Sequence, residues 1–144
     1  MDLATQNVSV FQGLGLGFVN GIAMDSADSI AVTTTEDDFA IEFYNFAAKT
    51  AVKVKLFNAT NQSQSGGYVA FDPVNKLFLI GQEFSSVAPT GSSILIYDTQ
   101  GNFIEAVNGL SLPASPVNIA INPIKRLGFV LVTPALTELQ SFSY

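Results

Sequence analysis

The chain has 144 residues, 48% of them hydrophobic and 12% charged, with a formal net charge of −6 and no cysteine or histidine. This composition excludes disulfides, thiol catalysis and His- or Cys-ligated metal sites, and the acidic balance makes a nucleic-acid partner unexpected. One core fits this length, and no apolar stretch approaches the roughly 20 residues of a membrane span. The first stretch, MDLATQNVSV, lacks a basic leader and an apolar run, so no signal peptide is expected in this sequence.

A short motif recurs three times and divides the chain into three units. It reads GIAMD at 21–25, YVAFD at 68–72 and NIAIN at 118–122, so its last residue recurs at intervals of 47 and 50. A turn rich in Asp, Asn, Ser or Pro follows each copy, and an apolar run typical of a buried strand follows each turn. Each unit therefore begins with a predicted β-hairpin.

Further strands are predicted in each unit. The predicted second strands span 30–34, 77–81 and 127–132, and the predicted third strands span 39–46, 93–98 and 138–144. Predicted fourth strands around 52–55 and 103–105 alternate apolar and polar residues, which favours an outer position with one face in water. The third unit ends at Tyr144 without a fourth strand, whereas residues 6–12 precede any complete unit and resemble the fourth strands. We therefore expect residues 6–12 to supply the missing strand.

Four-stranded units of about 40 to 50 residues indicate an all-β fold, the β-propeller, whose blades pack face to face around an axis. The Asp-Pro and Asn-Pro pairs after two of the first strands, and the run ILIYDT at 94–99 before Gly-Asn, resemble the YVTN and NHL-like repeat propellers. The resemblance covers nearly the whole chain. The repeats themselves predict one propeller domain, 1–144, with blades at 18–58, 65–108 and 116–144. The last blade lacks its own fourth strand and is closed by the N-terminal strand 6–12.

Three blades are fewer than the roughly four to eight of a closed propeller, so apolar blade faces would stay uncovered. We expect a second copy of the chain to complete a six-bladed ring with two-fold symmetry. In that ring, residues 6–12 of one subunit complete the third blade of the other. The alternative is a longer parent protein that carries the remaining blades.

Candidate binding residues lie in the predicted loops. The loops that lead into first strands lie at one end of a propeller tunnel, where Asn20, Gly66 and Asn118 can hold a sugar, a carboxylate or an ion. Turn geometry explains Asn and Gly at such positions without any ligand. The longer loop 82–92 presents Phe84 and Val87 as a candidate contact surface.

Acidic residues form two candidate Ca²⁺ sites. Asp25 lies near Asp28, and Asp37 and Asp38 follow Glu36 in the hairpin of the first unit. Carboxylates are ligands for calcium, but EF-hand spacing is absent and solvated turns give the same pattern. No other cofactor is expected.

No catalytic residue is predicted, because no G-x-S-x-G elbow occurs and the glutamates are scattered. We expect a non-enzymatic binding or structural scaffold that works as an assembly, with an extracellular or periplasmic location. The resemblance also implies an alternative, a metal-dependent lactonase-like hydrolase with its site on the propeller axis. A carbohydrate-binding propeller is a third reading, although the absence of Trp removes a common sugar platform.

Overall fold

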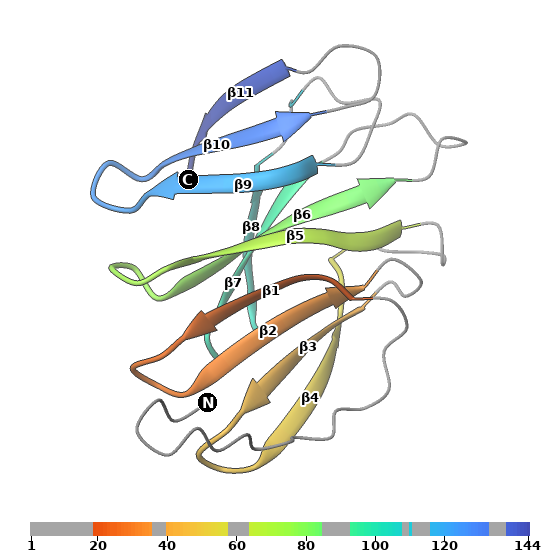
Figure 1. Cartoon of the computed structure of the whole chain (residues 1–144), viewed down its shortest axis with the longest axis vertical. Coiled ribbons are helices and arrows are strands. Elements are labelled where there is room, and N and C mark those ends of the chain that lie inside the picture. The colour runs from red at the N-terminus through yellow and green to blue at the C-terminus, as the bar shows by residue number, and fades with distance from the viewer. Residues whose placement is uncertain are drawn as a thin grey trace, which may run out of the picture.

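The described residues of the computed structural model form three antiparallel β-sheets and no helix (Figure 1). The structure describes residues 19–35, 40–57, 64–84, 93–107, 110, 116–132 and 138–144. The first sheet contains β1 (Val19–Asp25), β2 (Ile30–Thr35), β3 (Ala40–Asn45) and β4 (Thr50–Lys55). The second contains β5 (Gln64–Asp72), β6 (Leu77–Phe84), β7 (Ser93–Asp98) and β8 (Phe103–Val107). The third contains β9 (Pro116–Asn122), β10 (Leu127–Val132) and β11 (Glu138–Ser143).

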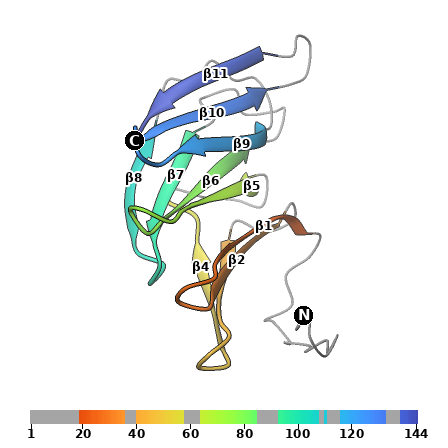
Figure 2. The ribbon, with the colours of Figure 1, turned by 60° about the vertical axis from the view of Figure 1, so that its left-hand side comes forward.

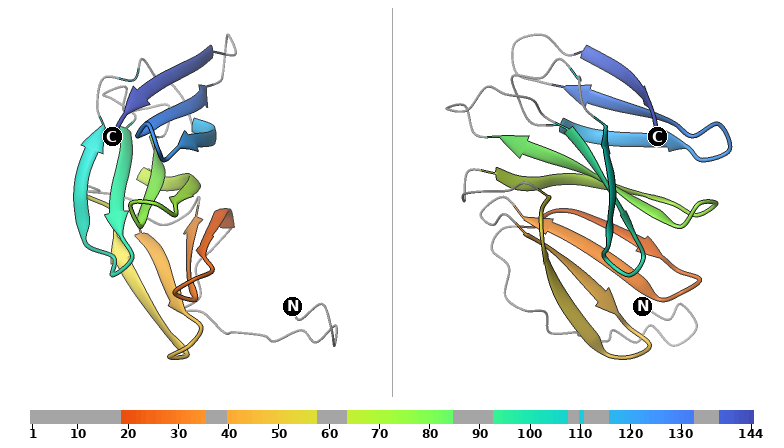
Figure 3. Two further views of the ribbon diagram at one scale, coloured as in Figure 1. Left: turned by 90° about the vertical axis from the view of Figure 1, so that its left-hand side faces the viewer. Right: turned by 180° about the vertical axis from the view of Figure 1, so that it is seen from behind.

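Each sheet is one blade of a partial propeller. Its strands follow chain order from one edge to the other, and every neighbouring pair is antiparallel. The first strands β1, β5 and β9 lie side by side, whereas β4 and β8 lie on the opposite side of the molecule (Figure 3). The predicted all-β propeller arrangement is therefore confirmed for the described residues. The predicted closing strand, 6–12, lies outside them.

The turn between the first two strands is built alike in all three blades. Asp25, Asp72 and Asn122 end the first strands, and Oδ1 of each accepts a hydrogen bond from a backbone N–H of the turn. Such side-chain bonds replace backbone pairing at a tight corner. The last residue of each turn has a positive φ: 58° at Ser29, 58° at Lys76 and 48° at Arg126.

Two apolar cores lie between successive blades. Val32, Ile41 and Phe43 of the first blade pack with Phe78 and Ile80 of the second. On the other side of the second blade, a further core unites it with the third. Its buried members are Leu79, Ile94, Ile96, Leu110, Ile119, Val130, Phe142 and Tyr144. Figure 2 shows the order of the blades, from β1 and β2 at the bottom to β9–β11 at the top.

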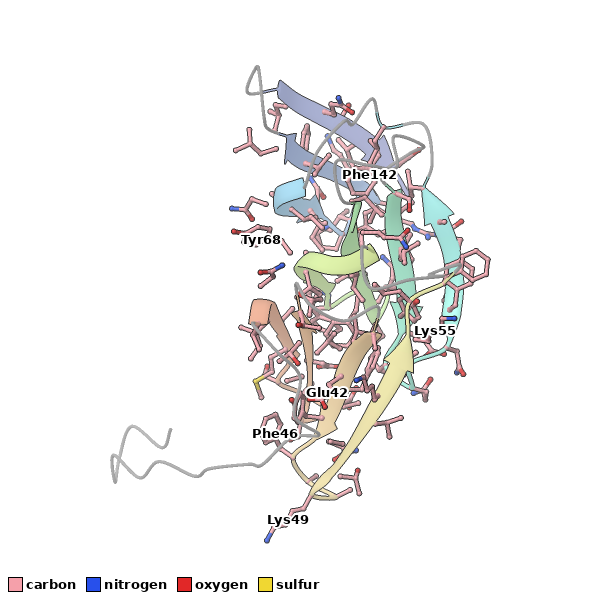
Figure 4. All side chains as sticks on the ribbon, turned by 90° about the vertical axis from the view of Figure 1, so that its right-hand side faces the viewer. Glu42, Phe46, Lys49, Lys55, Tyr68 and Phe142 are labelled. Atoms are coloured by element: carbon pink, nitrogen blue, oxygen red, sulfur yellow. The ribbon has the colours of Figure 1, made fainter. Side chains whose placement is uncertain are left out.

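The outer strands have the solvated face that the sequence predicts. Lys53 and Lys55 are exposed on β4, while Val54 on the same strand packs against the first core. In Figure 4, Lys49 stands at the tip of the turn that precedes β4 and points away from the sheets. Charged side chains on an edge strand disfavour pairing with another edge.

Candidate functional site

An ion pair joins the first blade to the second. The ammonium group of Lys76 lies 2.8 Å from Oδ2 of Asp25 and 3.0 Å from Oδ2 of Asp28. Asp25 is buried, and burial by itself disfavours its ionised form. The bonds from Lys76 and from the turn outweigh burial, so the pKa of Asp25 lies below its ordinary value. Asp25 therefore stays ionised and holds a cation of the neighbouring blade.

A hydrogen bond at the equivalent position joins the second blade to the third. The hydroxyl of Tyr144 donates to Oδ2 of Asp72 at 2.9 Å, within the buried region. Burial opposes ionisation of Asp72, but bonds from Asn75, Tyr144 and Val74 lower its pKa overall. The guanidinium of Arg126 lies 5.5 Å from the centre of the Tyr144 ring. Each junction thus joins the aspartate that ends one first strand to a donor of the next blade.

Aromatic contacts strengthen the first junction. The Tyr97 hydroxyl accepts a hydrogen bond of 2.9 Å from the backbone N–H of Phe57. The rings of Phe57 and Phe103 stack with centroids 3.8 Å apart and an interplanar angle of 3°. These bonds tie the end of the first blade to the outer strands of the second.

The first blade exposes two large apolar side chains of β1 on the side that faces away from the second blade. On β3 and β4 the same side carries Glu42, which is buried and accepts a hydrogen bond from the Tyr44 hydroxyl, and Lys53. We call Ile22, Met24, Ala31 and Thr33 the first-blade outer face, because strand pairing places them on one side of β1 and β2. Ile22 is 67% exposed and Met24 is 50% exposed. Ile119 stands three residues before Asn122, as Ile22 stands three before Asp25, yet Ile119 is only 7% exposed because the second blade covers it.

The third blade also has an outer side with apolar residues, together with the polar Asn118 and Ser141. We call Ala120, Phe129, Leu131 and Leu139 the third-blade outer face, from the pairing of β9, β10 and β11. Leu139 is 68% exposed, whereas the residues at its register position in the other blades, Ile41 and Ile94, are both 0% exposed. At this end of the arc, Asn122 is exposed where Asp25 and Asp72 are buried.

Two of the three predicted axial residues lie together. Nδ2 of Asn20 donates a hydrogen bond of 3.4 Å to the carbonyl oxygen of Gly66, which joins β1 to β5. Gly66 is buried, and a Cβ atom there would meet Thr34 at 3.0 Å, so close packing also favours glycine at this position. Asn118 is exposed on β9. Asn20 and Gly66 thus have structural contacts between β1 and β5, and the ligand-binding role of all three residues stays a prediction.

Phe84 ends β6, and Val87 of the predicted contact loop lies outside the described residues.

Two of the four predicted calcium ligands lie within the described residues. Asp37 and Asp38 lie outside the described residues. Asp25 and Asp28 do come together, but the cation between their carboxylates is the Lys76 ammonium group. Within the described ranges, no group of three or more acidic residues is placed to hold a metal ion. Calcium binding by Asp25 and Asp28 remains a prediction that requires Lys76 to move.

Sequence reasoning missed Lys76 and Tyr144 as junction residues. Each bonds to an aspartate of the preceding blade, 51 and 72 residues earlier in the chain. The repeat alignment did contain one signal of the junctions. Two first strands end in an acidic residue, Asp25 and Asp72, where the third ends in the neutral Asn122.

Three consecutive sheets with adjacent first strands define part of a β-propeller. Solved WD40 structures share this arrangement. The "Crystal structure of RRP9 WD40 repeats" matches with a TM-score of 0.65 and 14% identity over 85% of this chain and 34% of that one. The "Structure of U3-55K" matches with a TM-score of 0.64 and 14% identity over 85% and 35%. A chain of the "Crystal Structure of Mitotic Checkpoint Complex" gives 0.52 and 12% over 81% and 30%.

The present chain thus spans about a third of the propeller chains that it matches. At these identities the likeness concerns the fold. No protein-family model and no curated protein matches the sequence. Among the described residues, no helix has the length and apolar character needed to cross a membrane.

Proposed function

We propose that this chain is a non-enzymatic propeller module, a binding or structural scaffold that works only when further blades complete its ring. The observation that carries this proposal is the exposure of a large apolar side chain on each end face, 67% for Ile22 and 68% for Leu139. Apolar faces of this kind on a blade stack normally mark an interaction surface. A scaffold with two such apolar ends functions within an assembly.

The proposed assembly is a pair of chains that forms a six-bladed ring, in which residues 6–12 add the fourth strand to a third blade. The alternative is a longer parent protein, whose remaining blades would cover the two exposed end faces. The YVTN and NHL-like assignment and an extracellular or periplasmic location belong to this proposal. They rest on the repeat motifs and on the acidic composition with Ser-, Thr- and Asn-rich loops.

Ligands of the scaffold are proposed to bind at Asn20, Gly66 and Asn118, or through the loop that carries Phe84 and Val87. The bond from Asn20 to Gly66 supports the first site, because it brings two of the three residues to one end of the blades. The Mitotic Checkpoint Complex structure offers a parallel, since a chain of similar fold is part of a complex there.

Metal analysis of the purified protein tests the non-enzymatic function against the lactonase-like hydrolase. We expect no stoichiometric divalent ion after dialysis against metal-free buffer, and no lactone hydrolysis when calcium or zinc is added. A bound ion at one per chain together with lactone hydrolysis would overturn the scaffold proposal.

A further inference from the structure

We propose that the third-blade outer face docks head to tail onto the first-blade outer face of a second copy, with Asn122 opposite Ser29 of that copy. This inference rests on the proposed assembly and adds its polarity and its contact residues. It distinguishes a head-to-tail ring from a pair that joins like faces.

The apolar positions of the two outer faces match those of the junctions already formed. Ile22 and Met24 occupy the repeat positions of Ile119 and Ile121, which pack on the second blade. Leu139 occupies the position of Ile94, which packs on the third. The first-blade outer face therefore has apolar residues at the positions that pack on a preceding blade. The third-blade outer face has them at the positions that pack on a following blade.

The polar groups identify which blade follows the third. Wherever the first strand ends in Asp, the next blade provides a donor: Lys76 for Asp25 and Tyr144 for Asp72. The third blade ends its first strand in Asn122, which carries no charge. A blade that offers neither a cation nor a phenol at these two positions therefore suits it.

The first blade is such a blade. Ser29 has the turn position and the positive φ of Lys76. Phe46 has the position of Tyr144, because its N–H donates to the Ser29 carbonyl as that of Tyr144 donates to the Arg126 carbonyl. A neutral amide opposite a serine hydroxyl gives a hydrogen bond without a buried unpaired charge, and this charge match favours a second copy as the occupant.

Two identical head-to-tail contacts close a ring when each copy spans half of it. Three blades from each chain give six, within the range of about four to eight for closed propellers. A pair that joined like faces would instead set Asn122 against Asn122.

A charge-pair exchange between full-length chains tests this polarity. Asn122→Asp places a carboxylate opposite Ser29, and Ser29→Lys places a cation opposite Asn122. Each variant alone is expected to weaken self-association about 10-fold or more, because a buried charge lacks its partner. Lys76 shows that lysine fits this φ and reaches the preceding blade.

Mixing the two variants restores association in a head-to-tail ring. One junction then joins the carboxylate introduced at position 122 of one copy to the ammonium group introduced at position 29 of the other, as Asp25 joins Lys76. The second junction keeps the native residues. Sedimentation velocity and native mass spectrometry should show a mixed dimer about 10-fold or more tighter than either variant dimer. Gln100→Glu, which adds one negative charge on an exposed turn of the middle blade, serves as the control and should leave association unchanged.

The outcomes separate this inference from the proposed assembly. If the wild-type chain is dimeric and mixing gives no preferred mixed dimer, the junction of Asn122 with Ser29 is wrong while the association of two copies stands. If the wild-type chain is a folded monomer, both are wrong. Leu139→Asp provides a second variant, because Leu139 is exposed and its change should abolish the dimer without altering the circular dichroism of the blades; an unchanged dimer would also overturn the junction.

Discussion

The hydroxyl of Tyr144 donates a hydrogen bond of 2.9 Å to Oδ2 of Asp72, and this bond lies inside the junction between the second and third blades. Asp72 also accepts N–H bonds from Val74 and Asn75 of its own turn. Burial and the bond to Asp72 raise the pKa of Tyr144 to about 12. An ionised carboxylate and a neutral phenol therefore hold the turn of one blade to the last strand of the next.

Removing the phenol should weaken that junction. Tyr144→Phe leaves a buried oxygen of Asp72 without one of its donors, which costs about 1–2 kcal/mol of the free energy of unfolding. Urea denaturation at pH 7 measures this loss. Tyr68→Phe is the matched control, because the Tyr68 side chain is half-exposed and its change should cost under about 0.5 kcal/mol. Equal losses in the two variants would contradict the role of the Tyr144 bond.

The same groups predict how stability varies with pH. The pKa values of Asp25 and Asp72 are lowered in the folded chain, so their contribution is present above the ordinary value of 3.8 and is lost as pH falls through the folded pKa values. The pKa of Tyr144 is raised from 10.0 to about 12, so its contribution is present below pH 10 and is lost as pH rises towards 12.

The Tm should therefore be level between about pH 5 and pH 9 and fall on both sides. Tyr144→Phe should flatten the alkaline fall and reduce the acidic fall only in part, because Asn75 and Val74 still stabilise ionised Asp72 and the bonds of Asp25 are unchanged. An alkaline fall of equal size in this variant would show that other groups cause it.

The strands were within reach of the sequence because their boundaries are local. Predicted spans 93–98 and 127–132 coincide with β7 and β10, since each apolar run stops at residues that favour turns. The sequence also placed Asn20, Gly66 and Asn118 near the starts of the first strands, but it did not predict the residues that they contact. The bonds of Lys76 and Tyr144 were out of reach, because they join different repeat units and no period of the sequence specifies which donor meets which aspartate.

Lys76 should control both the first junction and any calcium binding there. Lys76→Met removes the cation between Asp25 and Asp28, so the Tm should fall at neutral pH and the difference should shrink as pH falls and the carboxylates become neutral. Roughly millimolar calcium should raise the Tm of Lys76→Met but leave the wild type unchanged. The double variant Lys76→Met/Asp28→Asn should lose this calcium response. An equal response in all three proteins would place calcium elsewhere.

Gly128 should tolerate no side chain. It pairs with Phe142 across β10 and β11, and the Phe142 ring covers the space where a Cβ atom would stand. Gly128→Ala should therefore displace the ring and lower the free energy of unfolding by about 1–3 kcal/mol. In the double variant with Phe142→Leu, the combined loss should be less than the sum of the two single losses, because the smaller side chain leaves room for the methyl group. Strict additivity would show that the ring does not set this restriction.

The mass of the wild-type chain in solution tests the proposed ring most directly. Light scattering across a concentration series should give about 31 kDa, twice the 15.3 kDa of one chain, because a second copy covers the outer faces bearing Ile22 and Leu139. A stable, fully folded monomer of 15.3 kDa at micromolar concentration would contradict the ring and the scaffold that depends on it.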